Sequence, residues 1–128
     1  MEIHEKEIAY YETANGKQPF RAWFISLKDK HAQMIVDARL ARIRKGNFGY
    51  CRDVGEGVTE LKIDFGPGYR VYFGKIGNKL VILLNGGNKS SQRNDIKTSH
   101  EYWADYRRRH GSKYEKKTYL PRGSDRET

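Results

Sequence analysis

The sequence has little cysteine and contains no long hydrophobic run. A single cysteine, Cys51, among 128 residues excludes an intrachain disulfide framework and is typical of a reducing compartment. No stretch approaches the ~20 apolar residues that a membrane-spanning helix needs. Residues 1–12 are charged and lack the apolar segment of a signal peptide. We therefore expect a cytoplasmic protein that has no membrane partner.

Acidic residues are also scarce relative to basic ones. The chain carries 25 Lys and Arg against 16 Asp and Glu, which gives a formal net charge of +9. In a chain of this size, such an excess favours a polyanionic partner such as nucleic acid, the ribosome or an acidic protein. The alternative is a basic surface that serves only solubility.

The length of the chain favours one domain with a hydrophobic core. Residues 1–110 contain the periodic apolar segments, whereas residues 111–128 are polar with scattered tyrosines. We therefore expect a domain over residues 1–110 and a polar tail over residues 111–128. Such a tail is flexible until a partner orders it.

Apolar periodicity and turn signals predict the secondary structure of this domain. The apolar run over residues 80–84 is typical of a central strand that is covered on both faces. The element order predicts an α+β fold, with an N-terminal strand and a helix hairpin packed on a curved antiparallel sheet, and a C-terminal helix. The predicted elements are a strand over 3–13, helices over 18–27 and from Asp29 to Gly46, strands over 50–54, 58–65, 69–73 and 80–84, and a helix capped by Ser90 or Ser91 and closed by Arg107, Arg108 and Arg109.

One face of the predicted sheet gathers positive charge. The apolar residues of strands 58–65 and 69–73 alternate and belong on the helix-covered face. The intervening residues share the opposite face, and they are Lys62, Asp64, Arg70 and Tyr72. Lys89 follows the next strand and can join them. Cations bind phosphate and aromatic rings stack on unpaired bases, so this face favours RNA. The alternative is a solvated face on which Lys62 pairs with Asp64 or Glu60.

The same residue types could also cleave RNA without a metal or other cofactor. Attack by the 2′-hydroxyl requires that this hydroxyl lose its proton, that the phosphate charge be neutralised and that the leaving oxygen gain a proton. Fixed cations stabilise the developing charge, and proton transfer needs a general acid or base. The candidates for proton transfer are Asp64, Tyr72, Asp95 and His100. The four histidines lie far apart in the sequence, so we expect no metal site.

Several segments together resemble the RelE/ParE toxin superfamily, and in particular its HigB-like branch of addiction module killer proteins. The resemblance covers about residues 8 to 107. The segments that carry it are E-L-K-I (60–63), G-P-G-Y-R-V-Y-F (66–73), L-L-N-G-G-N-K-S-S-Q (83–92) and Asp95-Ile96, with Trp23, Leu27, Arg39-Leu40, Gly46-Asn47 and V-G-E-G-V (54–58) upstream.

This resemblance implies the toxin of a type II toxin–antitoxin system. The expected activity is that of an mRNA interferase, an endoribonuclease that cleaves mRNA on the ribosome, inhibits translation and arrests growth. The expected partners are mRNA, the ribosome and a helix-turn-helix antitoxin, through which operator DNA is bound indirectly. By position, the resemblance implies that Lys62, Arg70 and Lys89 contact the phosphate. Together with the candidates from the residues themselves, we expect the catalytic residues to be Lys62, Arg70, Lys89 and Asp95, and the RNA-binding residues to be Lys62, Arg70, Tyr72, Lys89 and Arg93.

The sequence departs from the RelE pattern at three positions. Asp64 stands where a second lysine is usual, Asp95 lies about where a tyrosine is usual, and Tyr50 replaces an acid that is common in close relatives. Two alternatives therefore stay open. The ParE branch shares the fold but inhibits DNA gyrase, and a non-catalytic RNA- or ribosome-binding module would need only the cations.

Overall fold

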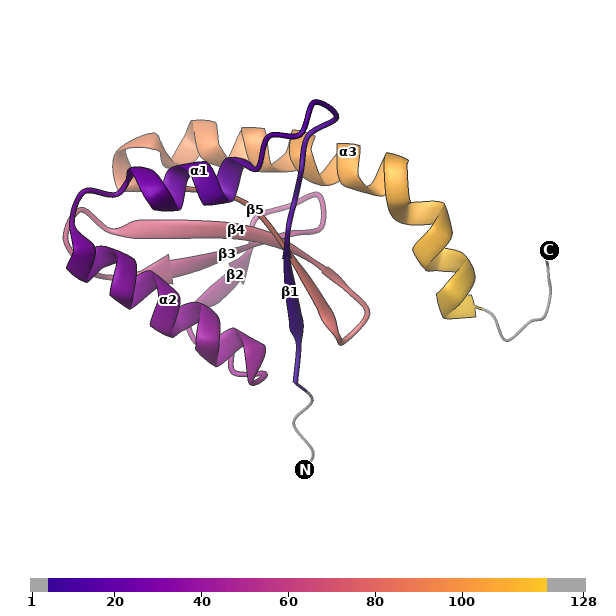
Figure 1. Cartoon of the computed structure of the whole chain (residues 1–128), viewed down its shortest axis with the longest axis horizontal. Coiled ribbons are helices and arrows are strands. Elements are labelled where there is room, and N and C mark those ends of the chain that lie inside the picture. The colour runs from indigo at the N-terminus through magenta and orange to yellow at the C-terminus, as the bar shows by residue number, and fades with distance from the viewer. Residues whose placement is uncertain (1–4, 120–128) are drawn as a thin grey trace.

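The computed structural model of the chain describes the backbone of residues 5–119 and the side chains of residues 5–110. It has an α+β fold in which helices cover both faces of a five-stranded sheet (Figure 1). The elements are β1 (Glu7–Tyr10), α1 (Pro19–Ser26), α2 (Lys30–Arg44), β2 (Cys51–Asp53), β3 (Val58–Ile63), β4 (Tyr69–Ile76), β5 (Leu80–Asn88), a 3₁₀ turn (Lys89–Ser91) and α3 (Gln92–Tyr119).

The strands lie in the order β1-β5-β4-β3-β2, and β2 to β5 form an antiparallel meander. β1 pairs parallel to β5, with Glu7 opposite Leu80. The sheet is therefore mixed, and the expectation of a purely antiparallel sheet is wrong. Parallel neighbours need a long crossover, and here the chain passes through α1, α2 and three strands before β5 reaches β1.

α1 and α2 pack on one face of the sheet, as the sequence predicts for the helix hairpin. Asp29 caps α2, because its side chain accepts hydrogen bonds from the backbone N–H groups of His31 and Ala32. The alternating apolar side chains of β3 and β4 point into this core, also as predicted. The core consists of Phe20, Ala32, Val36, Leu40, Ile43, Leu61, Ile63, Tyr69, Val71, Phe73, Val81 and Leu83.

α3 covers the opposite face, chiefly over β5 and β4. Trp103 packs on Gly74, where an added Cβ would lie 2.5 Å from the indole ring. Residues 81–84 are thus buried on both sides, as predicted, although β4 and not β5 is the central strand. The polar face expected on β3 and β4 is therefore partly covered. This second core consists of Tyr11, Val58, Tyr72, Ile82, Leu84, Trp103 and Tyr106.

The length of α3 differs from the expectation. Asn88 caps the 3₁₀ turn that leads into α3, because its side chain accepts a hydrogen bond from the Ser90 N–H at 3.0 Å, and Ser91 stands directly before the first residue of α3. The helix continues to Tyr119, past Arg109, and its last part extends beyond the sheet (Figure 1). Residues 111–119 of the predicted tail are therefore helical, and residues 120–128 lie outside the described residues. Among the described residues, no helix is both long and apolar enough to cross a membrane.

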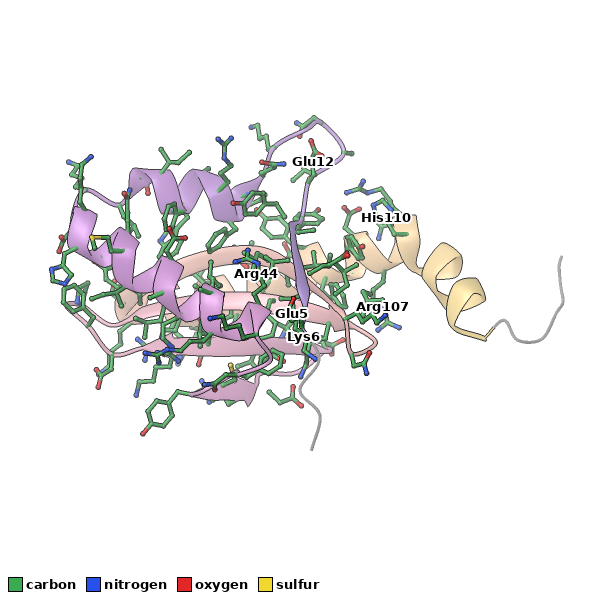
Figure 2. All side chains as sticks on the ribbon, turned by 60° about the horizontal axis from the view of Figure 1, so that its bottom comes forward. Glu5, Lys6, Glu12, Arg44, Arg107 and His110 are labelled. Atoms are coloured by element: carbon green, nitrogen blue, oxygen red, sulfur yellow. The ribbon has the colours of Figure 1, made fainter. Side chains whose placement is uncertain are left out.

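A polar contact ties α3 to the end of β1. The Tyr11 hydroxyl donates to Asp105 at 2.7 Å, and Arg109 donates both to Asp105 and to the Glu12 carbonyl. Hydrogen bonds from Arg109 and Tyr11 lower the pKa of Asp105 to about 2. Glu12 and His110 line a hollow at this junction (Figure 2). The junction therefore fixes the middle of α3 over the sheet, about four turns after the helix begins.

Candidate functional site

The three cations predicted from the sequence meet at one end of the sheet. Lys62 on β3 lies opposite Arg70 on β4, and Arg70 lies opposite Gly87 on β5. Lys89 follows β5 directly. A Cβ added to Gly68 would lie 2.9 Å from Arg70 Nη1 and 3.8 Å from Lys89 Cβ, so Lys89 begins beside the Arg70 guanidinium. We call Lys62, Arg70 and Lys89 the cationic row.

Arg70 is the buried member of the cationic row, with 6% of its surface exposed. Its Nη1 donates to the Gly68 carbonyl at 3.0 Å, whereas its Nε is buried without a hydrogen-bond partner. No acid among the described residues forms an ion pair with Arg70. A buried charge without a counter-charge costs free energy, so an anionic ligand would stabilise this guanidinium. Lys62 and Lys89 are exposed and can move toward such a ligand.

A buried carboxylate, Glu60, organises the polar residues beside the cationic row. Its Oε1 accepts from Arg52 Nε at 2.8 Å, and its Oε2 accepts from the Tyr72 hydroxyl at 3.0 Å and from Gln92 Nε2 at 2.8 Å. Burial raises the pKa of Glu60, but these three hydrogen bonds outweigh burial and leave the pKa below its usual value. Glu60 is therefore a carboxylate near neutral pH. We call Arg52, Glu60, Tyr72 and Gln92 the Glu60 network.

The sequence indicated Glu60 as a partner of Lys62, but no local signal pointed to Arg52 or Gln92 as its partners. In the structure Glu60 pairs with Arg52 instead. The alternation of β3 puts Glu60 on the same face as Lys62, so its face was predictable. The burial of Glu60 was not predictable from β3 alone. It depends on α3, whose Gln92 comes from a distant part of the chain.

Tyr72 does not have the role that was expected of it. Its ring is fully buried between the sheet and α3, and its hydroxyl is bound to Glu60. The expected stacking of Tyr72 on an RNA base is therefore wrong for this fold, because no face of the ring is accessible. Burial and the nearby Glu60 charge raise the pKa of Tyr72, so the phenol stays neutral and is a poor proton acceptor.

Asp95 lies close to the cationic row because Gly87 has no side chain. The Asp95 carboxylate accepts a hydrogen bond from Ser91 Oγ and occupies the space that a Cβ on Gly87 would fill. Since Gly87 is opposite Arg70, the carboxylate lies on the row that also contains Lys62 and Arg70. Asp95 is half-buried, so it can be both fixed and accessible. This placement agrees with its selection from the sequence.

The remaining candidates lie outside this cluster or at its edge. Arg93 is exposed in the first turn of α3, one residue after Gln92. Asp64 is exposed beyond the end of β3. His100 lies with Nε2 3.0 Å from the Val54 carbonyl, in contact with the loop that joins β2 to β3. In the part of the chain that the structure describes, no hydrogen bond or ion pair joins any of them to the cationic row.

The His, Cys, Asp and Glu side chains do not form a metal centre in the part of the chain that the structure describes. No three His, Cys, Asp or Glu side chains there come close enough to share an ion. The chemistry available in the cluster is instead that of fixed cations beside one carboxylate. Such a set binds an anion, stabilises negative charge that develops on it and can accept a proton.

Comparison with known proteins gives a relative but no activity. The chain is 47% identical over 78 residues to a protein of Haemophilus influenzae that is described as an uncharacterized protein. The matched residues make up 61% of this chain and 79% of that protein. No family model matches the chain.

Proposed function

We propose that this chain, which belongs to the same family as the Haemophilus influenzae protein, is the toxin of a type II toxin–antitoxin system. In this proposal it is a cytoplasmic, metal-independent endoribonuclease of RelE-like fold that cleaves mRNA on the ribosome. A helix-turn-helix antitoxin neutralises it and carries it to operator DNA. The sequence segments over residues 60–96 that resemble the HigB-like toxins support this proposal, together with the net charge of +9.

The observation that carries the proposal is the cationic row beside Asp95. An RNA phosphate that binds there would contact Arg70, which is fixed and forms no ion pair among the described residues, and the two exposed lysines. The 2′-oxygen of the preceding ribose loses its proton and attacks phosphorus, the bond to the 5′-oxygen of the next nucleotide breaks, and that oxygen takes a proton from water. The products are a 2′,3′-cyclic phosphate and a free 5′-hydroxyl. The cations stabilise the extra negative charge of the pentacovalent phosphate.

Asp95 is the residue that best fits the transfer of the 2′-hydroxyl proton. Its carboxylate is half-buried, fixed by Ser91 and placed on the row of Lys62 and Arg70. The other two carboxylates nearby are less suitable. Glu60 already accepts three hydrogen bonds, and Asp64 lies out in solvent beyond β3. A general base in this position contributes roughly 10²–10⁴-fold to a rate.

The proposal is tested by mapping RNA ends. Purified protein is incubated with mRNA and translating ribosomes, and new 5′ ends are located by primer extension. We expect Lys62→Ala to slow cleavage about 10²-fold, because it removes one charge from the stabilised phosphate. Lys79→Ala, an exposed lysine in the turn at the opposite end of β4, is the matched control and should cleave normally.

Two results would reject the endoribonuclease. If mRNA stays intact while DNA supercoiling by gyrase is blocked, the chain acts in the ParE manner. If RNA binds in a salt-dependent way but no ends appear with wild-type protein, the chain is a non-catalytic RNA- or ribosome-binding module. Either result would change the activity assigned to the cationic row, but not the positions of its residues.

A further inference from the structure

Tyr50 is the most exposed large hydrophobic residue of the described chain, with 76% of its surface accessible. It precedes β2, which forms one edge of the sheet. Its carbonyl accepts a hydrogen bond from the Lys62 N–H at 3.0 Å, so its backbone is held beside Lys62. An aromatic side chain this exposed on a fixed backbone gains nothing from the protein core and is free to contact a ligand.

Cations from three elements lie near the backbone of Tyr50. Arg39 on α2 donates to the Lys62 carbonyl at 3.2 Å, and its guanidinium lies 3.1 Å from where a Cβ on Gly49 would be. Arg52 follows two residues later on β2 and reaches Glu60. Among the described acids, none forms an ion pair with Arg39 or Lys62. We call Arg39, Tyr50, Arg52 and Lys62 the Tyr50 patch.

The Tyr50 patch and the cationic row share Lys62. The hydrogen bond between Lys62 and Tyr50 and the pairing of Lys62 with Arg70 place Tyr50, Lys62 and Arg70 side by side across β3 and β4 and the residue that precedes β2. Neighbouring strands lie about 4.8 Å apart. One short segment of RNA can therefore reach the phosphate position at Arg70 and the ring of Tyr50 together.

We propose that Tyr50 is the stacking platform for an unpaired RNA base next to the phosphate held by the cationic row. This inference rests on the proposed function and adds a binding residue to it. The burial of Tyr72 leaves the RNA face without an accessible aromatic ring on β4, and Tyr50 supplies one at the edge of the sheet. An exposed ring next to the unpaired cations Arg39 and Lys62 fits single-stranded RNA, because stacking and phosphate attraction act together there.

The test uses a short single-stranded RNA with 2′-O-methyl groups, which cannot be cleaved, and with 2-aminopurine as a stacking reporter. Binding is measured by fluorescence anisotropy for wild type, Tyr50→Phe and Tyr50→Leu. We expect Tyr50→Leu to bind about 5- to 150-fold more weakly and to lose the quenching of 2-aminopurine. Tyr50→Phe keeps the ring and should behave like wild type.

Tyr10→Leu is the matched control, because Tyr10 is the other exposed tyrosine in the side chains described and lies on the opposite edge strand. It should leave RNA binding unchanged. Thermal unfolding of each variant verifies that the exposed substitutions leave the fold intact.

The outcomes separate this inference from the proposed function. If Lys62→Ala weakens binding and Tyr50→Leu does not, the stacking platform is rejected while the RNA site stands. If Tyr50→Phe weakens binding as much as Tyr50→Leu, the hydroxyl and not the ring makes the contact, and stacking is again rejected. If wild-type protein does not bind the RNA at all, the proposed function and this inference both fail.

Discussion

Glu60 shows how one buried side chain can hold the site together. It is 2% exposed, yet its two oxygens accept hydrogen bonds from β2 and β4, the strands on either side of β3, and from α3. A buried carboxylate is tolerated only when its lone pairs are satisfied. Gln92 is the first residue of α3, so Glu60 also fixes where that helix begins, and thereby the position of Asp95.

Replacement of Glu60 should therefore destabilise the protein in a pH-dependent way. Glu60→Ala leaves the Tyr72 hydroxyl and Gln92 without an acceptor, and we expect a loss of about 1–3 kcal/mol in the free energy of unfolding at pH 7. Asp64→Ala, an exposed acid on the same segment, should change it by less than about 0.5 kcal/mol. Denaturant unfolding measures both.

The pH dependence follows from the direction of the pKa shift. The folded pKa of Glu60 is lowered, so its stabilising contribution is present above the unfolded pKa, about 4.3, and is lost as pH falls through the folded value. Asp105 contributes with the same sign, since its pKa is about 2. The difference between wild type and Glu60→Gln at each pH isolates Glu60, and that difference should shrink below pH ~4. A difference that stays constant with pH would contradict the ionised state of Glu60.

At the scale of the elements, two adjacent glycines on β5 let both layers of the fold approach the sheet. Gly86 lies against the Trp23 ring of α1, and Gly87 lies against Asp95 of α3. A Cβ at either position would collide with these side chains. Each glycine therefore makes room for a side chain that packs on one face of the sheet, and only Gly87 lies next to the candidate site.

This difference predicts the effect of alanine at each position. Both Gly86→Ala and Gly87→Ala should lower the free energy of unfolding by about 1–3 kcal/mol, because both overpack a core. Only Gly87→Ala displaces Asp95, so only it should reduce RNA cleavage, by at least about tenfold given the usual contribution of a general base. Cleavage is compared at a temperature where both variants are folded. Equal loss of cleavage in the two variants would mean that activity follows stability and not the position of Asp95.

The sequence predicted those elements whose signals are local. The cap at Asp29, the alternation of Leu61 with Lys62 and the apolar run over residues 80–84 all led to correct elements, because period and capping depend on neighbours in the chain. The parallel pairing of β1 was not predictable in this way. It depends on where β5 returns after a long crossover.

For the candidate site, the sequence predicted which residues share a face of the sheet, but not how deeply each is buried. Alternation assigned Lys62, Arg70 and Tyr72 to one face correctly, but alternation does not report depth. Tyr72 is buried against α3 and Arg70 is also buried, whereas Tyr50 is accessible at the edge of the sheet. The ring that we propose for base stacking, Tyr50, therefore lies next to β2 at the edge of the sheet and not on β4.

At the scale of the whole molecule, the charge distribution decides how an RNA partner would be held. The net charge of +9 attracts any polyanion, whereas a site holds a phosphate through particular cations. The structure offers a way to separate the two effects, because Lys62 and Lys79 are both exposed lysines near opposite ends of the sheet. Removal of either lysine lowers the net charge by one, but only removal of Lys62 takes a residue out of the cationic row.

Salt dependence of RNA affinity measures this difference. For single strands, the slope of log K against log salt concentration is about −0.7 for each phosphate that is neutralised. Lys62→Ala should make the slope shallower by about 0.7, because one phosphate contact is lost. Lys79→Ala should leave the slope nearly unchanged, although it removes the same charge. The measurement is a titration of non-cleavable single-stranded RNA at several salt concentrations. Equal changes in the two variants would mean that RNA is attracted by overall charge alone, and that the cationic row is not where the phosphate binds.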